Sequence, residues 1–143
     1  MKIVVGSDHA GLDLKETCKA HLNQLGIYEV VDKGVFTSES CDYPVVAHEV
    51  AETVSRGEAP FGILVCGSGI GMSIAANRHR NVRAALCHDL YAARMCRLHN
   101  NANVLALGGR VTGVDLALEI VHTFLATEFE GERHRRRVEQ IEV

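Results

Sequence analysis

A glycine-rich segment near the middle of the chain has the composition of an anion-binding loop. Residues 66–71 read CGSGIG, with three glycines in five positions, and they join an apolar run to a helical pattern. Glycine lets backbone N–H groups approach a bound oxyanion closely, and the N-terminus of the following helix adds positive potential. The segment therefore predicts an anion site, with a purely structural tight turn as the alternative.

Cys66 lies at the junction between the apolar run and this loop. A helix N-terminus stabilises a thiolate beside it, which makes Cys66 a candidate base or nucleophile. The alternative for any cysteine is an inert, buried side chain. We adopt that alternative for Cys18, Cys87 and Cys96.

A second polar segment follows the first apolar run of the chain. Residues 6–11 read GSDHAG, in which Asp8 is a candidate partner for a sugar hydroxyl and His9 for a hydroxyl or a phosphate. An aspartate that only caps a helix N-terminus is the alternative interpretation. If the preceding run is a strand beside residues 61–66, both side chains face the same crevice as Cys66.

Basic and amide side chains in the second half complete the candidate set. His99, with Asn100 beside it, is a potential acid or base, although a histidine at a helix C-terminus also complements the helix dipole. Arg110 follows two glycines after the last apolar run. Arg133 and Arg137 share a helix face at i and i+4, which suits a phosphate. A solvated basic patch is the alternative for this pair.

Three other kinds of site are disfavoured by spacing. A dinucleotide fingerprint needs GxGxxG, but Met72 stands where the third glycine would fall. Residues 6–11 space two glycines like a P-loop but lack its Lys-Ser/Thr pair. No Cys or His pair has the spacing of zinc ligands. The sequence therefore predicts neither a metal nor a cofactor, and nucleotide binding stays open as an alternative.

Short apolar runs alternate with helical patterns along the whole chain, which is typical of a parallel sheet covered by helices. The near-continuous hydrophobicity of these runs indicates strands that are buried on both faces. The predicted strands are Ile3–Gly6, Tyr28–Asp32, Phe61–Cys66, Val82–Cys87 and Asn103–Leu107.

Helices are predicted where apolar residues recur at helical spacing. They cover residues 14–25, 46–54, a stretch that starts within 69–74, residues 89–99 and 116–125, and a polar, Arg-rich stretch over about 132–141. Right-handed crossovers then predict a three-layer, doubly wound, Rossmann-like α/β fold with five parallel strands in the order 2-1-3-4-5. In such a sheet the crevice opens between strands 1 and 3, beside Ser7–Gly11 and Cys66–Gly71.

Length and composition predict one globular domain over residues 1–143. The chain is 47% hydrophobic and 23% charged, which excludes a disordered or fibrous class. A formal net charge of −3 disfavours a nucleic-acid partner. Five cysteines without CxxC spacing predict reduced thiols, and the absence of a signal-peptide core and of an 18-residue apolar stretch predicts a cytoplasmic location without membrane contact.

In combination these segments resemble the ribose-5-phosphate isomerase B family, to which the galactose-6-phosphate isomerase subunits are related. The resemblance spans essentially the whole chain. It rests on SDHAG at 7–11, DYP at 42–44, CGSGIG at 66–71, IAANR at 74–78, HN at 99–100 and the Arg-rich tail. It implies a metal-free aldose–ketose isomerase that works as a homodimer, or as a tetramer of two dimers, with active sites shared between chains.

The resemblance also implies residue roles. Cys66 is expected to move a proton between C2 and C1 of the open-chain sugar, and His99, helped by Asp8, to open the furanose ring. Ser68 and Asn100 are expected to contact sugar oxygens, and Tyr43 to line the site. The enediolate is expected on the loop amides of Gly67, Ser68, Gly69, Ile70 and Gly71, and the phosphate on His9, Arg110, Arg133 and Arg137.

We therefore predict reversible interconversion of D-ribose 5-phosphate and D-ribulose 5-phosphate through an enediolate, in the non-oxidative pentose phosphate pathway. This chemistry needs a base, an oxyanion site and a phosphate-binding site, without a redox cofactor or metal. The alternatives are isomerisation of a six-carbon sugar phosphate, such as allose 6-phosphate or galactose 6-phosphate, and a non-catalytic nucleotide- or anion-binding module. The Arg-rich helix reaches a two-fold-related neighbour's crevice more easily than its own, so Cys66 and Arg137 of one site are expected from different chains.

Overall fold

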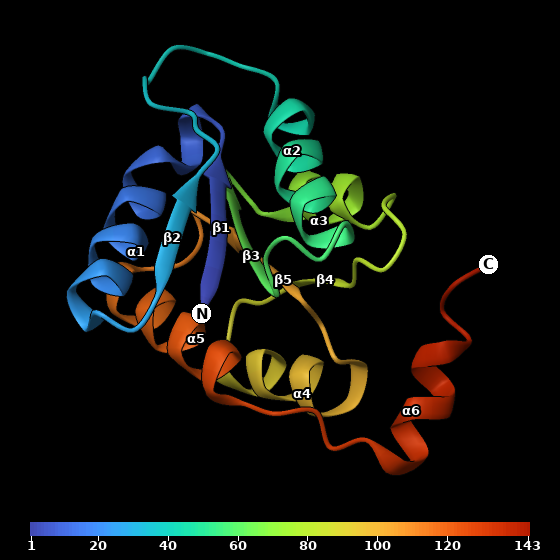
Figure 1. Cartoon of the computed structure of the whole chain (residues 1–143). Coiled ribbons are helices and arrows are strands. Elements are labelled where there is room, and N and C mark those ends of the chain that lie inside the picture. Colours follow the sequence, from blue (N-terminus) through green and yellow to red (C-terminus); the bar gives the residue numbers. More distant parts are fainter.

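The computed structural model describes residues 1–143 and contains one parallel five-stranded sheet between two layers of helices (Figure 1). The strands are β1 (Lys2–Ser7), β2 (Glu29–Asp32), β3 (Phe61–Cys66), β4 (Ala84–Leu86) and β5 (Val104–Gly108). The helices are the short 3-10 helix η1 (His9–Gly11), α1 (Leu12–Leu25), α2 (Tyr43–Ser55), α3 (Ile70–Ala76), α4 (Leu90–Asn100), α5 (Val114–Ala126) and α6 (Glu132–Glu139). The predicted α/β fold, including the C-terminal Arg-rich helix, is confirmed.

Alternate residues of the central strands pack into two separate hydrophobic cores, because successive side chains of a strand point to opposite faces. In β3, Ile63 and Val65 face the core covered by α1, α4 and α5, whereas Leu64 and Cys66 face the core covered by α2 and α3. Strands β1, β3 and β5 are buried over nearly their whole length. Burial on both faces explains the continuous apolar runs in the sequence.

The observed strand order is β2-β1-β3-β5-β4, so the predicted order 2-1-3-4-5 is wrong in its last two positions. Helix α4 packs in the same core as α1 and α5. Right-handed crossovers on one face of a parallel sheet all move the chain in the same direction. Helix α1 leads from β1 to β2, so α4, on the same face, leads from β4 back toward β3. Strand β5 therefore lies between β3 and β4. The three residues of β4 are half-buried, as suits an edge, whereas the five residues of β5 are buried.

Strands β1 and β3 are neighbours, with Ser7 of β1 opposite Val65 of β3. The chain leaves β1 toward one edge of the sheet and returns to β3 on the other side. Such a reversal opens a crevice at the carboxyl ends of the two strands. The segments that follow Ser7 and Cys66 are therefore placed side by side. None of the helices combines the length and hydropathy that crossing a bilayer requires.

Candidate active site

A cavity of about 650 Å³ lies at the carboxyl ends of β1 and β3. Its lining residues are Asp8, Tyr43, Cys66, Gly67, Ser68, Ile70, Gly71, Ile74, Arg110 and Val111. Eight of these ten were candidates from the sequence. The other two are Ile74, one helical turn after Ile70, and Val111, directly after Arg110. Each therefore lines the cavity because it is next to a predicted residue.

The Cys66 sulfur faces a backbone amide of the glycine-rich loop. The Gly69 N–H donates to Cys66 Sγ over 3.1 Å, and the cysteine is 5% exposed. Gly69 has a φ of 79°, and a Cβ there would lie 2.6 Å from Leu86 Cδ1, so this position requires glycine. An N–H aimed at the sulfur stabilises a thiolate, because it places partial positive charge beside the developing negative charge.

Several amides of the loop are left without an acceptor. The N–H groups of Gly67, Ser68 and Gly71 donate to no acceptor within the chain, whereas the Ile70 amide donates to Ser68 Oγ over 3.2 Å. Unpaired amides of this kind are expected where a helix begins. A Cβ on Gly71 would lie 2.6 Å from the Tyr43 ring, so glycine lets that ring pack against the loop. The loop therefore offers N–H groups to an oxyanion beside the Cys66 sulfur.

Arg110 is held beside this loop by the turn that follows β5. The Gly109 amide donates to the Cys66 carbonyl over 2.7 Å, and the Arg110 amide donates to the Gly67 carbonyl over 3.0 Å. The Arg110 guanidinium forms no ion pair within the chain. The cavity thus contains a cation without a partner, which suits a phosphate.

Asp8 combines both roles considered from the sequence. Its Oδ1 accepts from the Gly11 amide over 3.0 Å, so it caps η1, and it also lines the cavity with 6% exposure. The next residue, His9, does not line the cavity; its Nδ1 accepts from the Cys41 amide over 3.3 Å. Acceptance at Nδ1 leaves the ring proton on Nε2, which is then a donor. Sequence reasoning missed Cys41, because it lies 32 residues from His9.

Four predicted residues lie away from this cavity: His99, Asn100, Arg133 and Arg137. Helix α4, which ends at Asn100, precedes β5, whose first residue Val104 is opposite Gly62. Gly62 is four residues before Cys66 on β3, a separation of about 13 Å along the strand. Helix α6 stands apart from the loops that follow β1 and β3 (Figure 1). The structure therefore does not bring these four residues to Cys66 of the same chain.

At that distant end His99 stacks on a buried histidine. The ring centroids of His99 and His134 are 4.3 Å apart at an interplanar angle of 14°. Glu130 Oε2 lies 3.9 Å from His99 Nε2 and 3.7 Å from His134 Nε2. Burial and the charge of His99, with smaller contributions from Arg133 and Arg137, lower the pKa of His134, although the Glu130 carboxylate acts in the opposite direction. Sequence reasoning missed Glu130 and His134, because no local spacing connects them to His99.

His99, Glu130 and His134 place three metal-ligating atoms within 4.8 Å of one another, a grouping that the spacing analysis did not find. Their surroundings favour an anion over a cation. The Nε2 of His134 already accepts from Arg133 Nε over 3.4 Å. The Arg133 and Arg137 guanidiniums both act on His134 electrostatically, and they would repel a metal ion there.

Comparison with known proteins assigns nearly the whole chain to one family. Residues 3–141 match the family model described as Ribose/Galactose Isomerase. Ribose-5-phosphate isomerase B of Escherichia coli is 49% identical over 98% of this chain and 93% of that protein. D-erythrulose-4-phosphate isomerase of Pectobacterium atrosepticum is 44% identical over 99% of this chain and 93% of that protein.

A solved structure gives the same assignment. Ribose-5-phosphate isomerase B of Clostridium thermocellum superposes with a TM-score of 0.97 at 53% identity, over 99% of this chain and 95% of that one. Sequence and fold therefore agree along the full length. The chain belongs to the ribose/galactose isomerase family.

Proposed function

We propose that this protein is an aldose–ketose isomerase that interconverts D-ribose 5-phosphate and D-ribulose 5-phosphate. The observation that carries the proposal is the Cys66 sulfur beside a loop with unpaired amides, with Arg110 in the same cavity. A base, an oxyanion site and an unpaired cation are what isomerisation of a sugar phosphate through an enediolate requires. The similarity to ribose-5-phosphate isomerase B supports the same reaction.

The proposed mechanism begins at the Cys66 thiolate. In the aldose-to-ketose direction, the thiolate takes the proton from C2 of the open-chain sugar, which leaves the negative charge on O1. The hydroxyl proton of O2 then passes to O1, and the Cys66 thiol returns a proton to C1, so that a carbonyl forms at C2 and the thiolate is regenerated. The negative charge on the enediolate oxygen is stabilised by the N–H groups of Gly67, Ser68 and Gly71. Asp8 and the Ser68 hydroxyl, both of which line the cavity, bind sugar hydroxyls. The loop N–H groups are fixed before the substrate binds, so they need no reorganisation during the reaction.

The phosphate is proposed to bind between two copies of the chain. Arg110 and the Nε2–H of His9 supply one side, and Arg133 and Arg137 of a second copy supply the other. That copy would also bring His99, to open the furanose ring, and Asn100. Exposed apolar side chains at the mouth of the cavity, Ile70, Ile74 and Val111, support contact with a second copy. The proposed assembly is a homodimer with two shared sites.

A comparison of kcat/KM among sugar phosphates of different length tests the five-carbon assignment. The Pectobacterium relative is named for a four-carbon substrate and the family description includes galactose, so four- and six-carbon sugar phosphates are the competitors. We expect kcat/KM for ribose 5-phosphate to exceed that for D-erythrulose 4-phosphate and allose 6-phosphate at least about tenfold, because one methylene or hydroxyl changes binding by that order. A higher value for either competitor would contradict the five-carbon assignment. Calorimetric binding of ATP or NAD without turnover of any sugar phosphate would contradict isomerase function altogether.

A further inference from the structure

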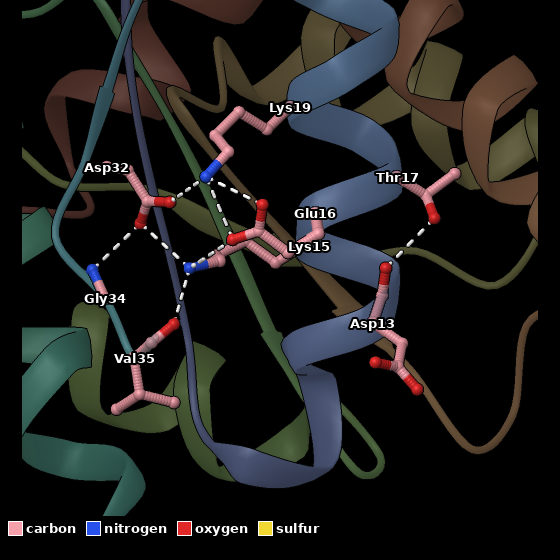
Figure 2. Close-up of polar contacts among 8 residues, drawn as sticks. All are labelled: Asp13, Lys15, Glu16, Thr17, Lys19, Asp32, Gly34 and Val35. Carbon is pink, nitrogen blue, oxygen red and sulfur yellow. Dashed lines mark hydrogen bonds and ion pairs between the residues drawn. The ribbon is translucent and has the colours of Figure 1, made fainter. Parts of the chain in front are cut away.

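A fully buried lysine lies beneath the loop that leads to the cavity. Lys15, in the first turns of α1, is 0% exposed. Its Nζ donates to Asp32 Oδ1 over 2.9 Å and to the Val35 carbonyl over 2.6 Å, and lies 3.2 Å from Glu16 Oε1 (Figure 2). The ring of Phe36 covers it, with 4.8 Å between Nζ and the ring centroid. The mechanism above gives this ammonium no role.

Asp32, at the end of β2, connects Lys15 to the start of the loop. Its Oδ1 also accepts from the Gly34 amide over 2.9 Å, while its Oδ2 accepts from Lys19 over 2.7 Å (Figure 2). Burial alone would raise the pKa of Asp32, but Lys19, the Gly34 amide and Lys15 together lower it. One ionised carboxylate therefore binds two ammonium groups and a loop amide. Lys19 contacts this carboxylate and Glu16 without a hydrogen bond to the loop.

The same loop is bonded to the end of β1 and to His9. The Ser7 amide donates to the Gly34 carbonyl over 2.7 Å, and the Val35 amide donates to the Ser7 carbonyl over 2.8 Å. Further along, the Cys41 amide donates to His9 Nδ1. The loop ends at Tyr43, which begins α2 and lines the cavity. Residues 33–42 thus connect the buried ammonium to His9 and to Tyr43, of which Tyr43 lines the cavity.

We propose that Lys15 is a positioning residue for sugar-phosphate binding: its ammonium, through Asp32 and the Val35 carbonyl, fixes the loop 33–42 that orients His9 and Tyr43. The proposal rests on the proposed function for its kinetic test. Both partners of Lys15 are needed. Asp32 accepts from Lys15 and from the Gly34 amide at the start of the loop, and the Val35 carbonyl that accepts from Lys15 belongs to the loop itself. Without the ammonium, the loop keeps its two bonds to Ser7 but loses its bond to α1.

The test compares Lys15→Met with Lys19→Met. Methionine keeps the length and flexibility of the lysine side chain, and Asp32 keeps Lys19 as its partner, so Lys15→Met leaves no unpaired carboxylate. Hydrogen exchange is measured on wild type and both variants. We expect the hydrogen-bonded amides of the loop, those of Lys33, Gly34, Val35 and Cys41, to exchange at least tenfold faster in Lys15→Met, with less than a twofold change in Lys19→Met. The hydrogen-bonded amides of Gly69 and Ile70 serve as the internal reference and keep their exchange rates in both variants.

Kinetics with ribose 5-phosphate then separate positioning from general loosening. We expect Lys15→Met to raise KM about tenfold while kcat changes less than threefold, and Lys19→Met to change neither more than twofold. Unchanged exchange in residues 33–42, an equal change in both variants, or faster exchange with an unchanged KM would each overturn the proposal. An inactive wild type would instead overturn the proposed function.

If Lys15→Met does not fold, Asp32→Asn takes its place, since it keeps an acceptor for the Gly34 amide but removes the charge that binds Lys15. The same exchange and KM changes are expected, and their absence has the same meaning.

Discussion

Two buried cysteines in this chain have different surroundings. Cys18, 1% exposed in the core covered by α1, α4 and α5, has its pKa raised to about 11 by burial, so its thiol stays protonated at neutral pH. Cys66 is also part of a core, but it lines the cavity and accepts a hydrogen bond from the Gly69 amide. Burial alone therefore does not identify the reactive thiol. Cys66 is proposed as the reactive thiol because its sulfur both lines the cavity and accepts a hydrogen bond from the glycine-rich loop.

Replacement of the proposed base, Cys66, is expected to slow the reaction strongly. Cys66→Ser keeps the shape of the side chain but replaces a thiol with a much weaker acid. We expect kcat for ribose 5-phosphate to fall at least about 100-fold, because general acid–base catalysis contributes about that much or more. KM should change less than threefold, since the phosphate and sugar hydroxyls keep their partners. Steady-state kinetics measure both values.

The control is Cys18→Ala, which removes a buried thiol from the other core. This variant should keep wild-type kcat even if its melting temperature falls. Iodoacetamide provides a second readout: carbamidomethylation of Cys66 should abolish activity, and bound ribose 5-phosphate should slow it. Retention of kcat in Cys66→Ser would move the base to another residue.

Some site residues could be predicted from sequence, because their signals are local. The CGSGIG loop combines a thiol with glycines in one short run, and the structure places it at the cavity. Cys41, Glu130 and His134 have no such signal. The partner of each one, His9 or His99, lies about thirty residues away in the chain, and only folding brings them together.

At the scale of elements, the sequence predicted the type of each segment better than its place. The apolar runs predict five strands, and three of these strands, β1, β3 and β5, are buried over nearly their whole length. The positions of β4 and β5 depend on which face α4 covers, and α4 packs with α1 and α5. Lys15 shows the same limit: a lysine in a helix suggests an exposed position, but Asp32 and the Val35 carbonyl make burial possible.

The ion-pair network between α1 and β2 predicts a dependence of stability on pH. The pKa of Asp32 is lower in the folded chain than its ordinary value, because Lys19, the Gly34 amide and Lys15 stabilise the carboxylate against the cost of burial. Its contribution is therefore complete above the unfolded carboxyl pKa of about 4, and it is lost as the pH falls through the folded value. We expect Asp32→Asn to lower the melting temperature by about 4 °C at pH 7 and by much less at pH 3. Differential scanning calorimetry from pH 3 to pH 7 measures this difference.

Glu58→Gln is the matched control, because Glu58 is an exposed carboxylate that reaches only the exposed Arg56 at 4.0 Å. Exposed pairs contribute little, so this variant should follow the wild-type curve at every pH. A melting-temperature difference for Asp32→Asn that stays constant from pH 7 to pH 3 would contradict the role of the Asp32 charge.

At the scale of the molecule, the polar residues fall into two groups at opposite ends of the sheet. Cys66, Asp8 and Arg110 line the cavity, whereas Arg137 and His99 belong to α6 and the end of α4. The first group contains the proposed base and one phosphate-binding cation, whereas the proposed ring-opening histidine and two further phosphate-binding arginines, Arg133 and Arg137, belong to the second group. Two-fold symmetry would bring the first group of one chain to the second group of its partner twice in each dimer. The position of the Arg-rich helix in the sequence predicts this sharing.

Refolding two variants together, each expected to be inactive alone, tests whether the sites are shared. Cys66→Ala and Arg137→Ala proteins are unfolded and refolded together in equal amounts. In a mixed dimer with shared sites, one site carries both substitutions and the other carries neither. Half of randomly paired dimers are mixed, so about a quarter of all sites should be intact, and the mixture should regain about that fraction of wild-type activity. Initial rates are compared with those of wild type refolded in the same way.

A second mixture serves as the control for that recovery of activity. Cys66 and Arg110 line one cavity within one chain, so every site of a Cys66→Ala and Arg110→Ala mixed dimer keeps one substitution. This control mixture should regain no activity, although its chains exchange to the same extent. Recovery in both mixtures would mean that substituted chains regain activity without complementation. Recovery in neither, with mixed dimers confirmed by native mass spectrometry, would place Arg137 and Cys66 of each site in the same chain or remove Arg137 from the site. Only recovery with Arg137 and none with Arg110 agrees with a site whose base and Arg-rich helix come from different chains.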